Sequence, residues 1–202
     1  MKKRILIVLL TVLSVININC KESISEEEKL KKTAEISKIS ARLYGGPLVD
    51  MLFMTMHDKG VKNAVEYCGG YATEYTKKTV PKIEQRMIQD FNIKSLDVRR
   101  TALKLRNPGN KPSETEEKVL LEWEEKYKKN EEINPAFFND NGIYKGMLPI
   151  KMTSPDCLNC HGSEERRHKE AYAKIKELFP EDKAVDYELN DIRGAILVKI
   201  EF

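Results

Sequence analysis

The segment Cys157-Leu158-Asn159-Cys160-His161 places two thiols and an imidazole within five residues. This Cys-x-x-Cys-His spacing is typical of c-type haem attachment. Each thiol can add to a vinyl group on one edge of the porphyrin, and the adjacent histidine can bind the iron from one side. We therefore expect one haem c, joined covalently to Cys157 and Cys160, with His161 as the proximal iron ligand.

Two other sites also use a Cys-x-x-Cys pair, namely half of a zinc site and a redox dithiol. The chain has no second Cys-x-x-Cys and no His-x-x-x-His that would complete a zinc site. A thioredoxin-type dithiol lies between a strand and a helix of a βαβ unit, and the strand-like residues followed by Pro155 do not provide that setting. The remaining alternative is a solvent-exposed His161 beside a chance pair of cysteines.

The N-terminus predicts export. Lys2, Lys3 and Arg4 precede an apolar run over residues 5–16, interrupted only by Thr11 and Ser14. This run is shorter than the roughly 20 residues needed to span a bilayer, but it suits a signal peptide over residues 1–19. Export to the periplasmic side of the membrane is also the setting in which c-type haem attachment takes place.

The end of the apolar run indicates a lipid anchor. Residues 17–20, Asn-Ile-Asn-Cys, resemble a bacterial lipoprotein signal, although Asn17 and Asn19 stand where leucine and a small residue are usual. We expect lipidation of Cys20, a tether over residues 20–29 and a single domain over residues 30–202. An ordinary cleaved signal peptide is the alternative.

Charge excludes some partners. The chain has 35 basic and 32 acidic residues, and residues 1–19 contain three of the basic ones and no acidic one. The mature chain is therefore neutral and offers no electrostatic reason to bind nucleic acid or anionic lipid. Any membrane contact is expected through the N-terminal lipid alone.

Cys68 is the cysteine left over after haem attachment and lipidation. It falls on one face of an expected helix, together with Val61, Ala64, Val65 and Ala72. From the residues alone, a buried core thiol is the favoured interpretation, because unpaired cysteines are commonly buried.

The remaining pattern predicts an α+β fold with a small antiparallel sheet. Capping boxes at Ser25 and Ser113 predict helices that begin near residues 26 and 114. Gly45-Gly46-Pro47 should break or kink the first helix, and Pro81 should open a short new one. The expected helices lie before residue 45, from residue 48 to a turn at residues 57–60, and over 61–72, 81–90, 114–129 and 164–178. The expected strands lie over 98–106, 144–152 and 196–202.

The strand over residues 98–106 ends in a basic loop. Arg100 and Arg106 could neutralise haem propionates through charge-assisted hydrogen bonds. A solvated strand face is the alternative. Asn107 and Asn110 are expected to stabilise their own turn.

Three segments together resemble the PAS-like c-type haem proteins, a family formerly classed as a domain of unknown function. They are Ala64-Val65-Glu66-Tyr67-Cys68, Arg106 to Pro112 ahead of Glu116, and Cys157 to Gly162. The resemblance covers most of residues 30–202. It implies a PAS-like sheet with long N-terminal helices around one covalent haem, whose iron is held by the motif histidine and a cysteine thiolate. Cys68 stands at the matching position for that thiolate.

The resemblance implies a redox or diatomic-gas sensing module with His161/Cys68 ligation. A monohaem electron carrier is the alternative, with a redox protein as its partner. A haem peroxidase would need a distal acid or base, which only His57 or His168 could supply, so we expect no catalytic residues. Other candidates for the second iron ligand are Met54, Met56, His57 and His168, which we expect to be packed or solvated instead.

Overall fold

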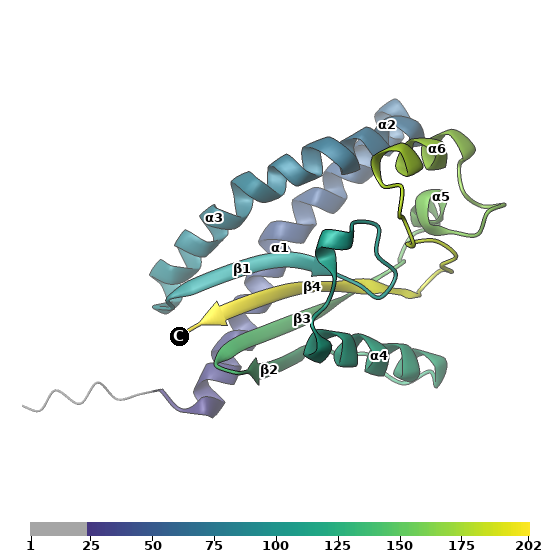
Figure 1. The fold of residues 1–202 in the computed structure, drawn as a ribbon. Coiled ribbons are helices and arrows are strands. Elements are labelled where there is room, and N and C mark those ends of the chain that lie inside the picture. The colour runs from purple at the N-terminus through teal and green to yellow at the C-terminus, as the bar shows by residue number, and fades with distance from the viewer. Residues whose placement is uncertain (1–23) are drawn as a thin grey trace, which may run out of the picture.

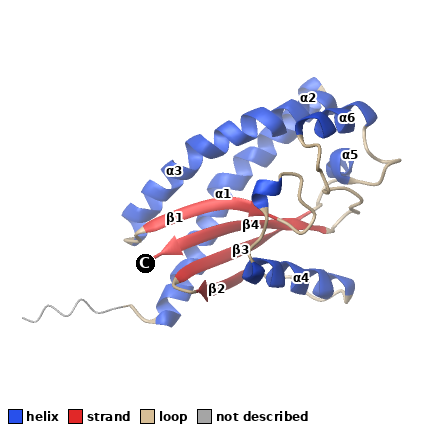
Figure 2. Ribbon diagram, in the orientation of Figure 1, coloured by secondary structure: helices blue, strands red, loops and turns tan. Residues whose placement is uncertain are grey.

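A four-stranded antiparallel sheet with the strand order β1-β4-β3-β2 forms the centre of the computed structural model (Figure 1 and Figure 2). Its strands are β1 (Ser95–Thr101), β2 (Ala136–Asp140), β3 (Ile143–Lys151) and β4 (Ile192–Glu201). The structure describes residues 24–202, and at Cys68 and Gly69 it describes the backbone alone. The expected α+β fold with a small antiparallel sheet is confirmed.

The expected signal peptide and the lipidated Cys20 lie outside the described residues. None of the helices among residues 24–202 is both long enough and apolar enough to cross a membrane. Export and lipidation therefore stay predictions.

The first helix, α1 (Glu26–Lys59), begins where the capping box places it, since the Ser25 side chain accepts a hydrogen bond from the Glu28 amide. A break at Gly45-Gly46-Pro47, one of the two expected alternatives, is wrong, because α1 runs through all three residues; the expected helical continuation beyond them is confirmed. Glycine fits there because a Cβ on Gly45 would lie 2.7 Å from Ile196 Cδ1 of β4. The helix therefore packs closely against the sheet at this point.

Pro47 has no amide hydrogen, so it cannot bond to the carbonyl of Leu43 four residues earlier. The Tyr75 hydroxyl donates to that carbonyl across 3.3 Å. Tyr75 belongs to α3 (Ala72–Phe91), so a neighbouring helix satisfies the group that the proline leaves unpaired. This contact explains why α1 tolerates Pro47 in its interior.

The second helical segment is longer and less regular than expected. Gly60, with φ 82°, ends α1, and α2 (Val61–Glu66) follows at once. A π-helical turn, η1 (Tyr67–Tyr71), then joins α2 to α3 and contains the backbone of Cys68. Pro81 lies inside α3 and does not open a new helix, so that prediction is wrong. Single π-helical turns are rare and occur frequently at functional sites.

The helices α1 and α3 cover one face of the sheet (Figure 1). In the last strand, Val198 and Ile200 are fully buried, and Ile196 and Phe202 pack against the same core. The buried members of this core are Ile36, Tyr44, Leu48, Ala72, Ile83, Met87, Ile93, Leu96, Val98, Tyr144, Val198 and Ile200.

The opposite face is covered by α4 (Glu114–Lys128), which packs Leu120 and Trp123 against Met147 and Leu197 of the sheet. This helix confirms the one expected over residues 114–129. Strand β2 was not expected from the sequence; it pairs with β3 across a tight turn.

The expected strand over residues 98–106 ends at Thr101, so Arg106 lies in the following loop. The short helices η3 (Pro155–Cys157) and α5 (Leu158–His161) follow β3. Helix α6 (Lys169–Leu178) begins later than expected. Elements α2, α5 and α6 gather at the same end of the sheet (Figure 1), where they surround the site described next.

Candidate cofactor site

A cavity of about 290 Å³ lies at this end of the sheet and brings together most of the predicted site residues. Cys157, Cys160, His161, Arg100 and Arg106 all line it. Its volume is near the lower end of the range for small-molecule pockets. The apolar part of the lining comes from α1, α2, α6, the end of β3 and neighbouring loops: Val49, Leu52, Phe53, Met56, Ala64, Val65, Ala102, Leu105, Ile150, Met152, Ile175 and Phe179.

The two thiols are positioned by a short helical segment. The Ser154 side chain accepts a hydrogen bond from the Asp156 amide, and Pro155 occupies the first turn of η3. Cys157 is the last residue of η3, and Cys160 lies three residues later in α5. A spacing of three residues in helical backbone places two side chains on the same face. Both are half-buried and line the cavity.

His161 has one ring nitrogen fixed by the backbone. Its Nδ1 lies 2.7 Å from the carbonyl oxygen of Ala184, which can only accept, so Nδ1 carries the hydrogen. Arg106 Nη2, 3.3 Å from Nδ1, is then a close neighbour and not a donor to it. In the neutral ring, Nε2 keeps its lone pair, which is the arrangement of a metal-binding histidine.

Burial holds the pKa of His161 well below its usual value, and the positive charges of Arg106 and Arg193 act in the same direction. The imidazole is therefore neutral at pH 7. Neutral imidazole is the form that binds metals. The Tyr187 ring meets it edge-on, with 6.1 Å between ring centroids.

Arg106 is tied to the thiol-bearing segment. Its Nη2 donates to the Cys160 carbonyl over 2.8 Å, and its Nε lies 3.3 Å from Asp182 Oδ1. Arg100, which the sequence also suggested, lines the cavity from the end of β1 and is exposed to solvent.

Arg193, which the sequence pattern does not predict as a site residue, lines the cavity as well. It lies at an irregularity where Ile150 pairs with Gly194 but Lys151 pairs with Ile192, so Arg193 is the extra residue of a bulge. Gly194 has φ 152° and packs against the Thr101 carbonyl, where no side chain would fit. The Gly194 in the sequence is the signal that could have suggested the bulge.

The cavity has an excess of positive charge. Its basic lining residues other than His161 are Arg100, Arg106, Lys151 and Arg193, and its acidic one is Asp156. The buried carboxylate of Asp182 pairs with Arg106 from outside the lining. Two positive charges remain, so a ligand that carries two carboxylates would neutralise them.

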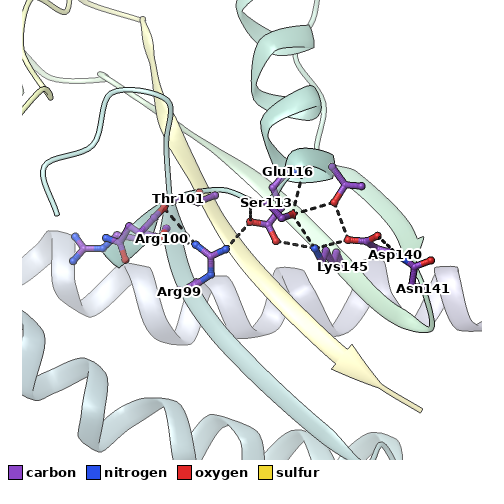
Figure 3. A network of polar contacts seen from close by, with 10 residues as sticks. Arg99, Arg100, Thr101, Ser113, Glu116, Asp140, Asn141 and Lys145 are labelled. Carbon is purple, nitrogen blue, oxygen red and sulfur yellow. Dashed lines mark hydrogen bonds and ion pairs between the residues drawn. The ribbon is translucent and has the colours of Figure 1, made fainter. Parts of the chain in front are cut away.

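The loop that carries Arg106 is anchored by a buried polar network (Figure 3). The Asn110 carbonyl accepts hydrogen bonds from Thr101 Oγ1 at 3.0 Å and Arg99 Nη1 at 3.4 Å. Arg99 also pairs with the fully buried Glu116, which receives a second ion pair from Lys145 at 2.8 Å. The network thus fixes the loop to α4 and to the sheet.

Burial would raise the pKa of Glu116, but the hydrogen bonds from Lys145 and the Ser113 amide and the charge of Arg99 outweigh it, and the pKa lies below its usual value. A carboxyl group whose pKa falls on folding stabilises the protein above its unfolded-state pKa of about 4.3. This contribution is lost as the pH falls through the lower, folded-state pKa.

We expect Glu116→Gln to lower the free energy of unfolding by about 3 kcal/mol, because Lys145 and Arg99 lose the charge that compensates their burial. Urea unfolding at pH 7 measures the change. Glu117→Gln, on the exposed side of the same helical turn, is the control and should change stability by less than about 0.5 kcal/mol. Equal stabilities of the two variants would contradict the network's role.

Cys68 lies in η1, but its side chain is outside the described part of the structure. Ala64 and Val65 before it and Thr73 after it all line the cavity. Its role as an iron ligand stays a prediction.

The four other candidates for the second iron ligand differ in their position relative to the cavity. Met56 lines the cavity, whereas Met54 is 58 % exposed. His57 is exposed beside Asp58. His168 caps α6, where its Nδ1 accepts from the Ala171 amide at 3.3 Å. Of these four, only Met56 is among the cavity-lining residues that the structure describes.

The chain matches one protein-family model and one solved structure. The family model described as "Tll0287-like: Tll0287" matches residues 11–201. The crystal structure of the cyanobacterial heme-protein Tll0287 is similar, with a TM-score of 0.56 and 21 % sequence identity, and the match covers 88 % of this chain and 97 % of that one. No curated protein matches. Since the family model spans nearly the whole sequence, the chain belongs to the Tll0287-like family.

Proposed function

We propose that this chain is an exported c-type haem-binding protein, with thioether bonds from Cys157 and Cys160 to one haem and with His161 as an iron ligand. The observation that carries the proposal is that both thiols, the imidazole and an excess of positive charge converge on one cavity. The structurally similar protein is itself named a heme-protein, which supports the same conclusion.

The lining fits the proposed cofactor in two respects. Its apolar residues suit a flat macrocycle, and its two excess positive charges match the two propionate groups of a haem. Arg106 and Arg193 are held in place by protein contacts, since Arg106 donates to the Cys160 carbonyl and Arg193 to the Lys104 carbonyl. A bound haem would supply a redox-active iron.

The proposal is tested by expressing residues 20–202 behind a cleavable export signal, in cells that carry c-type maturation enzymes. We expect haem that stays with the chain in denaturing electrophoresis, a mass increased by one haem, and a pyridine haemochrome spectrum of the two-thioether type. A folded, exported chain without covalent haem would overturn the proposal.

We further propose Cys68 as the second axial ligand. Residues on both sides of η1 line the cavity, and π-helical turns, which are rare, occur frequently at functional sites. A thiolate donates electron density strongly and therefore favours ferric iron. The rival among the described residues is Met56.

Sensing is the function that this ligand pair supports best. If Cys68 takes a proton and leaves the iron on reduction, it opens a site for a diatomic gas and releases η1, which links α2 to α3. Reduced protein that binds carbon monoxide as Cys68 detaches would support sensing. Reduced protein that keeps both ligands and excludes carbon monoxide would favour the alternative, an electron carrier.

A peroxidase-like enzyme has the least support, because neither His57 nor His168 is among the described residues that line the cavity. We place the protein on the periplasmic side of the membrane, anchored through a lipid on Cys20. Its partner is then a diatomic ligand or a redox protein in that compartment.

A further inference from the structure

A short segment, residues 182–187, runs along the thiol-bearing motif and bonds to its backbone. The Tyr187 amide donates to the His161 carbonyl at 2.9 Å, and the Asp186 amide donates to the Gly162 carbonyl at 3.1 Å. These two hydrogen bonds are tertiary contacts and do not belong to any pair of strands. Its conformation therefore affects how His161 is held.

Asp182 begins this segment with a carboxylate that is fully buried. Its Oδ1 accepts hydrogen bonds from Arg106 Nε at 3.3 Å and from the Ala184 amide at 3.0 Å. Its Oδ2 is buried and has no hydrogen-bond partner among the residues that the structure describes. A buried carboxylate with one unpaired oxygen is costly, so a structural role alone is a poor explanation for it.

Both groups that Asp182 holds go on to contact the motif. Ala184 turns its carbonyl to His161 Nδ1 at 2.7 Å, and Arg106 donates to the Cys160 carbonyl at 2.8 Å. One carboxylate thus controls the hydrogen bond that orients the imidazole and the position of a guanidinium in the cavity. Outer groups of this kind tune metal-bound histidines in other proteins.

We propose that Asp182 is a positioning residue for the haem iron site: it fixes the orientation of His161 and the place of Arg106, and its negative charge stabilises the ferric state. This inference rests on the proposed function, because it needs iron at His161. A plain turn-stabilising role for Asp182 would affect folding but not the properties of the folded, haem-loaded protein.

The test compares Asp182→Asn and Asp182→Ala with the control Asp186→Asn in haem-loaded protein. Asp186 lies in the same segment, its side chain is 65 % exposed, and its φ of 57° suits asparagine. Reduction potentials and ferric electron paramagnetic resonance spectra are measured for all three and for wild type.

We expect Asp182→Asn to shift the ferric-to-ferrous equilibrium about tenfold toward ferrous iron, a rise of about 59 mV for one electron. Its ferric resonance should change little, because the amide oxygen can still accept from Ala184. Asp182→Ala should raise the potential at least as much and also alter the ferric resonance, because it no longer fixes the Ala184 carbonyl. Asp186→Asn should match wild type.

Haem-loaded Asp182→Asn with the same potential as Asp186→Asn would overturn the inference alone. Wild type without covalent haem would refute the proposed function and the inference with it. If Asp182→Ala does not accumulate, Asp182→Asn still decides the result, because it keeps the oxygen acceptor and the side-chain volume.

Discussion

The double variant Cys157→Ala/Cys160→Ala is expected to carry no covalent haem. Each thiol supplies one thioether bond in the proposed site, and Cys157 and Cys160 are the two cysteines of the motif. Each single variant should keep one bond and show a shifted pyridine haemochrome band. Haem staining after denaturing electrophoresis, together with the mass of the intact chain, measures the result.

Asn159→Ala is the matched control for this experiment. Asn159 lies between the two cysteines, and its known bond is a backbone one, from the His168 amide to its carbonyl at 2.9 Å, which alanine keeps. The variant preserves the Cys-x-x-Cys-His spacing and should attach haem as wild type does. Covalent haem on the double cysteine variant would show that the attachment site lies elsewhere.

The core of the candidate site was predictable because its chemistry is local. Cys157, Cys160 and His161 are fixed by a spacing of five residues, and a short capped turn is enough to place them together. Arg193 was not predictable in the same way. It enters the cavity at a bulge in the pairing of β3 with β4, and pairing register depends on strands that are more than 40 residues apart.

The fold predictions that are wrong also fail because of contacts between residues far apart in the sequence. The sequence predicts a break or a kink at Gly45-Gly46-Pro47, because proline leaves a carbonyl unpaired in a helix. Tyr75, 32 residues away from Leu43, supplies the missing donor, and Gly45 leaves room for the Ile196 side chain of β4. By contrast, the helix starts at Ser25 and Ser113 are confirmed, with a complete capping box at Ser113 and the serine half of one at Ser25, since these hydrogen bonds span only three residues.

Cys68→Ala is expected to change the iron site more than any other single substitution outside the motif. If Cys68 is the second ligand, its loss removes a strong anionic donor. The ferric protein should then lose its low-spin thiolate resonance, and the reduction potential should rise by on the order of 0.1 V, within the range of about 0.8 V that axial ligands control. Optical and electron paramagnetic resonance spectra and a redox titration measure these changes.

Met56→Leu serves as the matched variant, because Met56 is the rival ligand among the described cavity-lining residues and leucine keeps its apolar volume. It should leave the ferric spectrum and the potential unchanged. Identical ferric spectra for Cys68→Ala and wild type would exclude Cys68 as a ligand, and a change in Met56→Leu alone would assign that position to Met56. Because a thioether favours ferrous iron more than a thiolate does, the second outcome would also remove the reason to expect ligand release on reduction. This pair of variants therefore identifies the second ligand. If it is Cys68, carbon monoxide binding by the reduced wild-type protein then separates sensing by Cys68 detachment from electron transfer with fixed ligands.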